Sequence, residues 1–350
     1  MTTMAAEPGC VTGGVDTHLD VHVAAAVDHL GGVLGTASFP TTAAGYRRLL
    51  RWLRGFGALQ QVGVEGTGSY GSALARYLTQ QDVAVLEVGR PNRQVRRRHG
   101  KTDVVDAIAA ARAVLSGEAT ATPKTHDGPV ECLRVLKVVH RSANKNRTQS
   151  LNQLRNLVAT APDGLRAKLR ALRTDELIST CAAFRVGPDD DSLLAVTRLA
   201  LRELAQRIEL LEAQLERVLL RLARITRATA PELLAAHGVG PDTASTLLVS
   251  AGDNPHRLGT ESAWAALLGS NPIPASSGKI NRHRLNRGGD RQANAALWRI
   301  AFVRMRSDPD TRAYIIKRTA EGKSKPEAIR CLKRYIAREL YSKLPREALT

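Results

Sequence analysis

The sequence predicts a mixed fold, with an α/β domain in the first third of the chain and mainly helical regions in the rest. Two patterns indicate this. Before residue 117, short apolar segments of alternating character lead into a regular alternation of helix and strand patterns. After it, apolar residues recur at spacings of three and four, which is typical of helices. A chain of 350 residues is long enough for two or three domains, each with its own core.

The first third contains three strands and then alternating helices and strands. Residues 1–10 are expected to form a flexible tail. Strands are predicted at 11–16, 21–27, 33–39, 61–65 and 83–88, and helices after Thr41 or Thr42, after Gly68, just before residue 101, and at 103–115. Three antiparallel strands followed by such an alternation is the order of a ribonuclease H-like domain, which we place at residues 11–117.

Asp103 and Asp106 lie in the first turn of the last of these helices, whose alanine-rich run ends at Ser116-Gly117. Positions i and i+3 share one helix face. Two neighbouring carboxylates repel each other unless a cation such as Mg²⁺ lies between them. The pair therefore predicts half of a metal site, although a pair of capping residues favoured by the helix dipole is an ordinary alternative.

Asp16 and Glu65 end two of the predicted strands, and strand ends in an α/β sheet are where ligands bind. Either acid alone is more often a surface residue or turn former. Together with the helical pair they predict a site for two Mg²⁺ or Mn²⁺ ions about 4 Å apart, which serves phosphoryl transfer. The segments around Asp16 and Gly66-Thr67-Gly68 also resemble the phosphate loops of actin-like sugar kinases. That fold needs two such halves, a second is not found after residue 120, and a net charge of +18 fits a kinase poorly.

The charge indicates a polyanionic partner, since the net charge is +18 and the pI is about 10.4. Basic residues precede the Asp pair, and we expect them to hold a phosphate backbone, although such a run is often only a solvated face: Arg90, Arg93, Arg96, Arg97, Arg98, His99 and Lys101. Aromatic residues make up only 4% of the chain, which argues against base stacking as the main mode of contact.

A reducing, cytoplasmic location is expected. No segment approaches 18 consecutive apolar residues, and the first ten residues lack the pattern of a signal peptide. The four cysteines are far apart and form no CxxC motif, so they indicate neither a zinc site nor a disulfide framework: Cys10, Cys132, Cys181 and Cys331.

The middle of the chain, residues 129–229, follows a linker at 118–128 and is predicted to be helical. A helix over 130–158 has a polar middle, in which Arg141, Lys145 and Arg147 are expected to contact nucleic acid. Prolines and glycines interrupt 160–191, and its Asp triplet at 189–191 is expected to cap the next helix. That helix has a heptad seam: Leu201, Leu204, Ile208, Leu211, Leu215, Val218, Leu222 and Ile225. It predicts a coiled coil with the helix at 130–158 or with another chain, hence oligomerisation or a protruding arm.

The last part, residues 230–345, combines a glycine turn with a basic loop. His237-Gly238-Val239-Gly240-Pro241 has the pattern of a helix-hairpin-helix turn, and a plain helix–helix turn fits equally well. Ser276 and Ser277 lie on a loop of small residues, where a hydroxyl would be accessible. Cations that could position a phosphodiester follow this loop: Lys279, Arg282, Arg284, Arg287 and Arg291.

With these acids and this loop, the chain resembles the DEDD transposases of the insertion sequence 110 family, which are related to Piv-type DNA invertases. The resemblance runs from about residue 11 to 345. The stretches that carry it are Gly14-Val15-Asp16-Thr17-His18, Val64-Glu65-Gly66-Thr67-Gly68-Ser69-Tyr70, Lys101-Thr102-Asp103-Val104-Val105-Asp106-Ala107, and Ser276-Ser277-Gly278-Lys279 continuing into Arg287-Gly288-Gly289-Asp290-Arg291-Gln292-Ala293-Asn294. Leu19 and Ala296 depart from the pattern, at positions where polar or basic residues are common.

The resemblance implies four metal-binding acids at Asp16, Glu65, Asp103 and Asp106, in a domain similar to the Holliday-junction resolvase RuvC. It places the serine nucleophile on Ser277, with Ser276 as the fallback. It further implies a covalent phosphoserine–DNA intermediate formed across a multimer, and an element-encoded guide RNA that pairs with DNA, so that the protein recognises mainly backbone and shape.

Three hypotheses follow. The first is a DNA recombinase in which Mg²⁺ and Ser277 act together. The second is a resolvase-like nuclease that uses the acids and water. The third is a non-catalytic nucleic-acid-binding remnant of an element, which the presence of all four acids and the serine loop disfavours.

Overall fold

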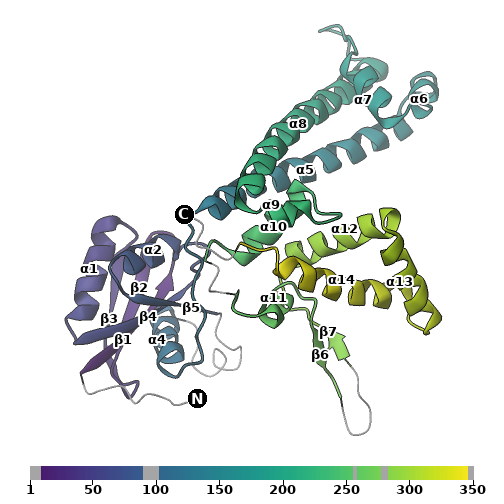
Figure 1. Cartoon of the computed structure of the whole chain (residues 1–350). Coiled ribbons are helices and arrows are strands. Elements are labelled where there is room, and N and C mark those ends of the chain that lie inside the picture. The colour runs from purple at the N-terminus through teal and green to yellow at the C-terminus, as the bar shows by residue number, and fades with distance from the viewer. Residues whose placement is uncertain (1–8, 90–101, 255–257, 277–282, 346–350) are drawn as a thin grey trace. The chain divides into compact units, whose positions relative to one another are not determined.

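The computed structural model describes residues 9–89, 102–254, 258–276 and 283–345 (Figure 1). They belong to two compact units. The first comprises Met1–Gly128 together with Gly252–Gly259, and the second Pro129–Ala251 together with Thr260–Thr350. Among the described residues, no helix is both long enough and apolar enough to cross a lipid bilayer.

The first unit is built on a mixed five-stranded sheet, which confirms the α/β prediction. Its strands are β1 (Cys10–Thr17), β2 (Val21–Val27), β3 (Val33–Pro40), β4 (Ala58–Glu65) and β5 (Ala84–Val88). Their order in the sheet is β3-β2-β1-β4-β5. β2 pairs antiparallel with both β1 and β3, whereas β4 lies parallel to β1 and β5 parallel to β4. β1 is therefore the central strand.

Helices cover both faces of this sheet. α1 (Ala43–Arg54), which Thr42 caps, and α2 (Ser72–Gln80) pack on one face around a core that includes Leu49 and Leu74. α4 (Asp103–Leu115) packs on the other face, where its small alanines contact the sheet. The alternation of β1 separates these two environments, because successive residues point to opposite faces.

Glycines let α4 approach the sheet very closely. A Cβ atom on Gly14 of β1 would lie 2.2 Å from the carbonyl oxygen of Ala107 and 2.2 Å from the amide nitrogen of Ala111. A Cβ atom on Gly63 of β4 would lie 2.8 Å from the carbonyl oxygen of Ala110. No real side chain fits at such distances, so the two glycines determine how closely α4 packs on β1 and β4.

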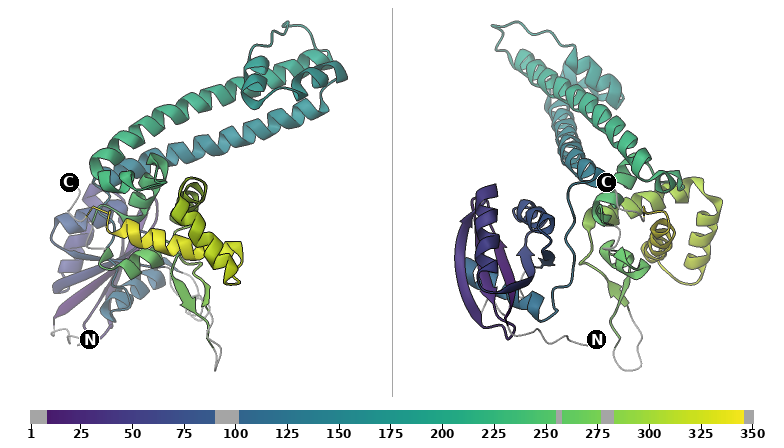
Figure 2. Two further views of the ribbon diagram at one scale, coloured as in Figure 1. Left: turned by 45° about the vertical axis from the view of Figure 1, so that its right-hand side comes forward. Right: turned by 60° about the vertical axis from the view of Figure 1, so that its left-hand side comes forward.

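Two long helices form an arm within the second unit (Figures 1 and 2). α5 (Pro129–Thr160) and α8 (Leu193–Thr229) lie side by side, and α6 (Asp163–Arg170) and α7 (Thr174–Ala182) join them at the far end. A core cluster at that end contains residues of all four helices. Buried apolar side chains therefore hold the four helices together at the tip of the arm.

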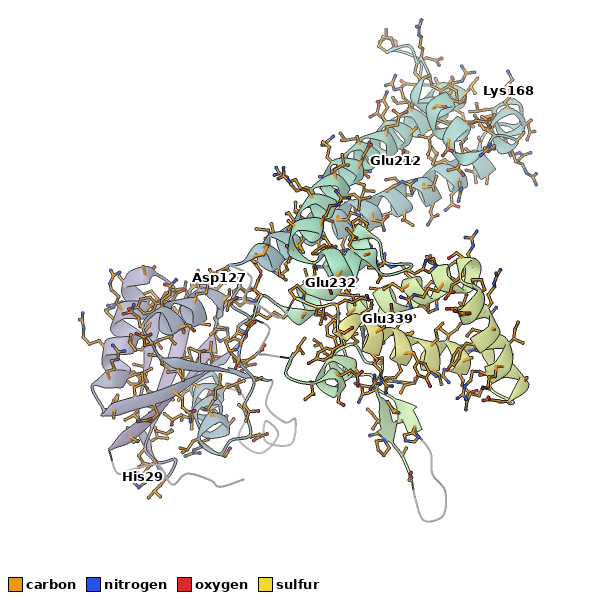
Figure 3. All side chains as sticks on the ribbon, in the orientation of Figure 1. His29, Asp127, Lys168, Glu212, Glu232 and Glu339 are labelled. Carbon is orange, nitrogen blue, oxygen red and sulfur yellow. The ribbon has the colours of Figure 1, made fainter. Side chains whose placement is uncertain are left out.

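The heptad residues of α8 lie on its covered side. Leu201, Ile208 and Leu222 are buried, and the other five are half-buried. α5 of the same chain covers this side, and Glu212, which is labelled in Figure 3, accepts a hydrogen bond of 2.7 Å from Arg147 Nε across the pair. Pairing with another chain, and coiled-coil geometry, stay predictions.

The remaining elements of the second unit are α9 (Pro231–Ala235), α10 (Pro241–Ala251), α11 (Glu261–Leu267), β6 (Pro272–Pro274), β7 (His283–Leu285), α12 (Arg291–Ser307), α13 (Pro309–Ala320) and α14 (Lys325–Tyr341). Trp264 of α11 is fully buried, and its Nε1 donates a hydrogen bond of 3.1 Å to the carbonyl oxygen of Ala337 on α14. Arg304 of α12 donates hydrogen bonds both to the backbone oxygen of His237 and to Glu339, which is labelled in Figure 3. These contacts connect the glycine turn to the C-terminal helices.

An ion-pair cluster joins three helices at the base of the arm. Asp242 of α10 accepts a hydrogen bond from the buried Lys137 of α5, and its Oδ2 lies 2.6 Å from Arg299 Nη1 of α12. His140 Nδ1 lies 3.4 Å from Asp242 Oδ1. Burial opposes ionisation of Asp242, but Lys137 and Arg299 outweigh it and hold the pKa of this carboxyl below its usual value.

Candidate functional site

The register of the sheet brings Asp16 and Glu65 to neighbouring strand ends. Gly14 lies opposite Gly63 in the parallel β1–β4 pair, and each acid follows its glycine by two residues. Residues two apart share a face, so both acids belong to the face that α4 covers. The Thr17 hydroxyl donates a hydrogen bond of 2.8 Å to the Glu65 carbonyl oxygen, which fastens the two ends together.

The first turn of α4 brings its acids to the same place. Thr102 caps the helix, since its side chain accepts a hydrogen bond of 3.3 Å from the amide of Val105. Asp103 and Asp106 both lie in the first turn, as expected. Asp106 is buried, with 4% of its surface exposed, whereas Asp103 is exposed toward solvent.

His18, just after β1, connects the strand acid with the helix acid. Its Nε2 lies 3.1 Å from Asp16 Oδ2 and 3.3 Å from Asp103 Oδ1. His18 belongs to the Gly14–His18 motif, in which the sequence alone assigned it no role. Its position two residues after Asp16 was the only signal, and a lone histidine near a strand end does not show by itself that it faces a helix from another part of the chain.

The electrostatics of Asp16 reflect this crowding of acids. Burial raises the pKa of the Asp16 carboxyl above its usual value, His18 opposes that shift, and the charges of Asp106 and Asp103 add to it. Ionisation of Asp16 is thus less favourable in the protein alone than in water. A cation at this position would remove that cost.

The donor atoms suit a hard divalent cation. One atom each from Asp16, His18 and Asp103 lies within 4.8 Å of the others. Carboxylate oxygens are the ligands that Mg²⁺ and Mn²⁺ prefer. Within the described part of the chain, Glu65 and Asp106 are not in this set of three, although the sheet register and the helix turn place them beside it. The structure therefore contains an acidic cluster that can hold a divalent metal.

The basic residues proposed to bind nucleic acid fall in several places. Arg141 and Lys145 are exposed on α5, whereas Arg147 pairs with Glu212. Arg284, Arg287 and Arg291 are exposed and line one cavity of the second unit. The other residues assigned a role lie outside the described residues: Ser277, Arg93, Arg96, Arg97, Arg98, Lys101, Lys279 and Arg282.

Comparison with known proteins agrees with this arrangement. A family model for DEDD transposases of insertion sequence 110, described as "Transposase", matches residues 13–161 and so includes the four acids. A second, described as "Transposase IS116/IS110/IS902 family", matches residues 230–315 and so includes Ser277. A protein of Streptomyces coelicolor named "Insertion element IS110 uncharacterized 43.6 kDa protein" is 36% identical over 115 residues. That match spans 33% of this chain and 28% of the relative. The chain belongs to the insertion sequence 110 family of transposases.

Proposed function

We propose that the protein is a DNA transposase that cleaves and rejoins strands by phosphoryl transfer at the acidic cluster of its first unit. The observation that carries the proposal is the meeting of Asp16 and Asp103 at His18, from a central strand and from a helix distant in sequence. The strand order β3-β2-β1-β4-β5, with α4 across the central strands, supports assignment of this unit to the ribonuclease H-like fold.

The four acids would hold Mg²⁺ or Mn²⁺ in this domain. Asp16 and Asp103 supply ligands, and Glu65 and Asp106 border them. When bound, the metal would neutralise charge on the scissile phosphate and polarise it. His18 orients the oxygens of Asp16 and Asp103 that face it, and the glycine contacts hold α4 in place.

Ser277 would act as the nucleophile, with Ser276 as the alternative. Its hydroxyl oxygen attacks phosphorus, so that an Oγ–P bond forms while the bond from phosphorus to a deoxyribose oxygen breaks. The hydroxyl proton ends on the departing oxygen, and the strand stays attached to the protein as a phosphoserine ester. The departing hydroxyl keeps the reaction reversible, because it can attack the ester in a later step.

The basic surface and the helical arm would serve assembly on nucleic acid. The net charge of +18 favours contact with phosphate backbones. An element-encoded guide RNA would then supply the sequence recognition, and two or four protomers would assemble on the element ends and the target DNA.

The test uses purified protein, Mg²⁺, the element's flanking RNA and end-labelled junction DNA. We expect a protein–DNA adduct that protease removes, present with the wild type and lost with Ser277→Ala and with Asp103→Asn. DNA binding in EDTA should stay within about twofold for both variants, because neither residue lies among the basic ones proposed to hold the backbone. Ser276→Ala is the matched control and should retain the adduct.

Other outcomes would change the assignment. An adduct that survives in Ser277→Ala but not in Ser276→Ala would move the nucleophile by one residue. Cleavage without an adduct, unaffected by either serine substitution, would show that the acids act with water as a hydrolytic nuclease. Metal-independent binding without any strand breakage would indicate a non-catalytic remnant.

A further inference from the structure

A large basic groove lies within the second unit, whereas the acidic cluster belongs to the first. It has a volume of about 1120 Å³ and is bordered by the β6–β7 hairpin, α12, α13 and α14. Nine of its described lining residues are cations: Arg284, Arg287, Arg291, Arg318, Lys323, Arg330, Lys333, Arg334 and Arg338. Glu327 is the one carboxylate among the described lining residues. The groove therefore has a strong excess of positive charge.

Acids neutralise only part of this charge. Arg334 pairs with Glu261, Arg318 with Glu321, and Arg330 with Glu327. On the hairpin side, by contrast, Arg284, Arg287 and Arg291 form no ion pair with any acid that the structure describes.

Lys333 adds to the excess positive charge of this groove. It is half-buried, and its Nζ donates a hydrogen bond of 2.5 Å to the neutral side chain of Asn294. Burial lowers the pKa of Lys333, and the neighbouring Arg330 adds to that shift. An anion that enters the groove would therefore stabilise the charged form of Lys333.

Aromatic rings line the same groove. Trp298 is 48% exposed and stacks on Phe302 with the ring centres 5.3 Å apart. Tyr335 is 56% exposed and meets Tyr314 edge to face at 5.6 Å. Three of these rings line the groove: Trp298, Tyr314 and Tyr335. In a chain with only 4% aromatic residues, this is a local concentration that the overall composition conceals.

We propose that this groove binds an unpaired nucleic-acid strand, whose phosphates contact the cations while its bases stack on Trp298 and Tyr335. Exposed rings beside unneutralised cations are the combination that binds single strands, because every base has a face for stacking. A duplex keeps its base faces inside and would use only the cations. The volume exceeds the range of about 300–1,000 Å³ typical of single small ligands, which fits several linked nucleotides.

The inference deepens the proposed function by giving its nucleic-acid substrate an unpaired segment next to the serine loop. β6 ends at Pro274, two residues before Ser276, so the hairpin that borders the groove also carries that loop along the chain. Strand exchange requires that bases be unpaired near the cleaved bond, and the groove would hold them.

The test measures binding by the full-length protein in EDTA, so that cleavage plays no part. The probes are fluorescein-labelled (dT)12, (U)12 and a 12-base-pair DNA duplex, followed by anisotropy. We expect Trp298→Ala and Tyr335→Ala each to weaken binding of the single strands about tenfold and to leave duplex binding within about twofold. Trp298→Phe, which keeps a flat ring, should restore most of the affinity. A preference for (dT)12 over (U)12, or the reverse, identifies DNA or RNA as the natural strand.

Cation variants give an independent readout. Arg291→Ala should reduce the slope of log affinity against log salt by roughly 0.7 for the single strands. Arg306→Ala is the matched control on the same helix, exposed but outside the groove, and should leave the slope unchanged. Binding that is equal in Trp298→Ala, Tyr335→Ala and wild type, or that falls equally for strand and duplex, would overturn the proposal. A failure of strand cleavage in the adduct experiment would not, because binding here needs neither metal nor Ser277.

Discussion

At the scale of single residues, Gly14 controls the distance between the strand acid and the helix acids. Gly14→Ala would place a methyl group 2.2 Å from backbone atoms of α4, which cannot yield as a side chain can. We expect a loss of about 3 kcal/mol in the free energy of unfolding, measured by urea titration, together with loss of strand cleavage. Gly68→Ala is the control, since nothing lies within 4 Å of the added Cβ. A Gly14→Ala protein of wild-type stability would show that α4 is not pressed on β1.

The buried His22 makes stability depend on pH. It is fully buried, stacks on Tyr46 with the ring centres 5.7 Å apart, and neither ring nitrogen has a hydrogen-bond partner among the described residues. Burial, and to a lesser degree His18, lowers its pKa to about 4. The unfolded chain therefore gains a proton as the pH falls below about 6.5, while the folded protein does not until about pH 4.

Stability should accordingly fall on acidification. Between pH 7.5 and pH 5.0, His22 accounts for a loss of about 2 kcal/mol in the free energy of unfolding. His22→Phe, which can keep the stack on Tyr46, should show a loss smaller by that amount in urea titrations at the two pH values. An identical pH dependence in the variant and the wild type would mean that His22 is protonated in the fold.

The sequence identified the site residues through motifs, and the structure adds how they meet. Asp16, Asp103 and Asp106 were predicted because several acids at strand ends and in one helix turn, taken together with Glu65, are harder to explain as ordinary turn or capping residues than any one of them alone. His18 could not be predicted, because its contact with Asp103 depends on the depth of α4 on the sheet. The departure at Ala296 has a physical reason, since this residue is fully buried in α12, where a basic side chain would lose its hydration.

At the scale of elements, the Asp242 cluster holds α5, α10 and α12 together. Asp242→Ala would leave the Lys137 ammonium, which is 6% exposed, without its carboxylate. We expect a loss of about 3 kcal/mol in the free energy of unfolding. Lys137→Met should cost less, because Met fills the stem volume without burying a charge.

The control for this prediction is Arg166→Ala. Arg166 pairs with Asp163 on the surface, and we expect its loss to cost less than about 1 kcal/mol. Equal costs for Asp242→Ala and Arg166→Ala would contradict the view that burial makes the Asp242 cluster important.

Strand and helix patterns predicted most elements, and the exceptions have identifiable causes. The residues of β2 were predicted without error, and β4 begins three residues earlier than expected, at Ala58. The short strands β6 and β7 were missed, because Pro272 and Pro274 cannot donate the hydrogen bonds of a strand interior. Ser192 rather than the Asp triplet caps α8, and Asp190 accepts a hydrogen bond from the Ser192 amide.

At the scale of the whole molecule, metal should stabilise one unit and not the other. The proposed ligands Asp16 and Asp103 both belong to the first unit. We expect Mg²⁺ to slow amide hydrogen exchange in peptides from β1 and α4 and to leave α12, α13 and α14 unchanged, as measured by mass spectrometry. Asp16→Asn should abolish the effect. Slowing throughout the chain, or none, would contradict the assignment of the site.

The two units depend in part on contacts between residues that are far apart in the sequence. The predicted linker at 118–128 ends where the first unit ends, at Gly128. The segment Gly252–Gly259, however, belongs to that first unit, and the Asn254 side chain donates a hydrogen bond of 2.9 Å to the carbonyl oxygen of Pro123. A contact between residues so distant in the chain has no signature in local periodicity.

The arm formed by α5 and α8 has a mechanical consequence. α5 has 32 residues, which corresponds to a length of about 48 Å. Helices α6 and α7 pack against α5 and α8 at one end of the arm. At the other end α10 packs against the pair, and Lys137 donates a hydrogen bond to Asp242. In the proposed assembly on nucleic acid, the pair would act as a lever that pivots at α10. A rotation there of about 10° would carry the far end through about 8 Å, more than twice the spacing of about 3.4 Å between successive bases. In that assembly, a small change in side-chain packing at α10 would thus change which nucleotide lies within reach of the tip of the arm.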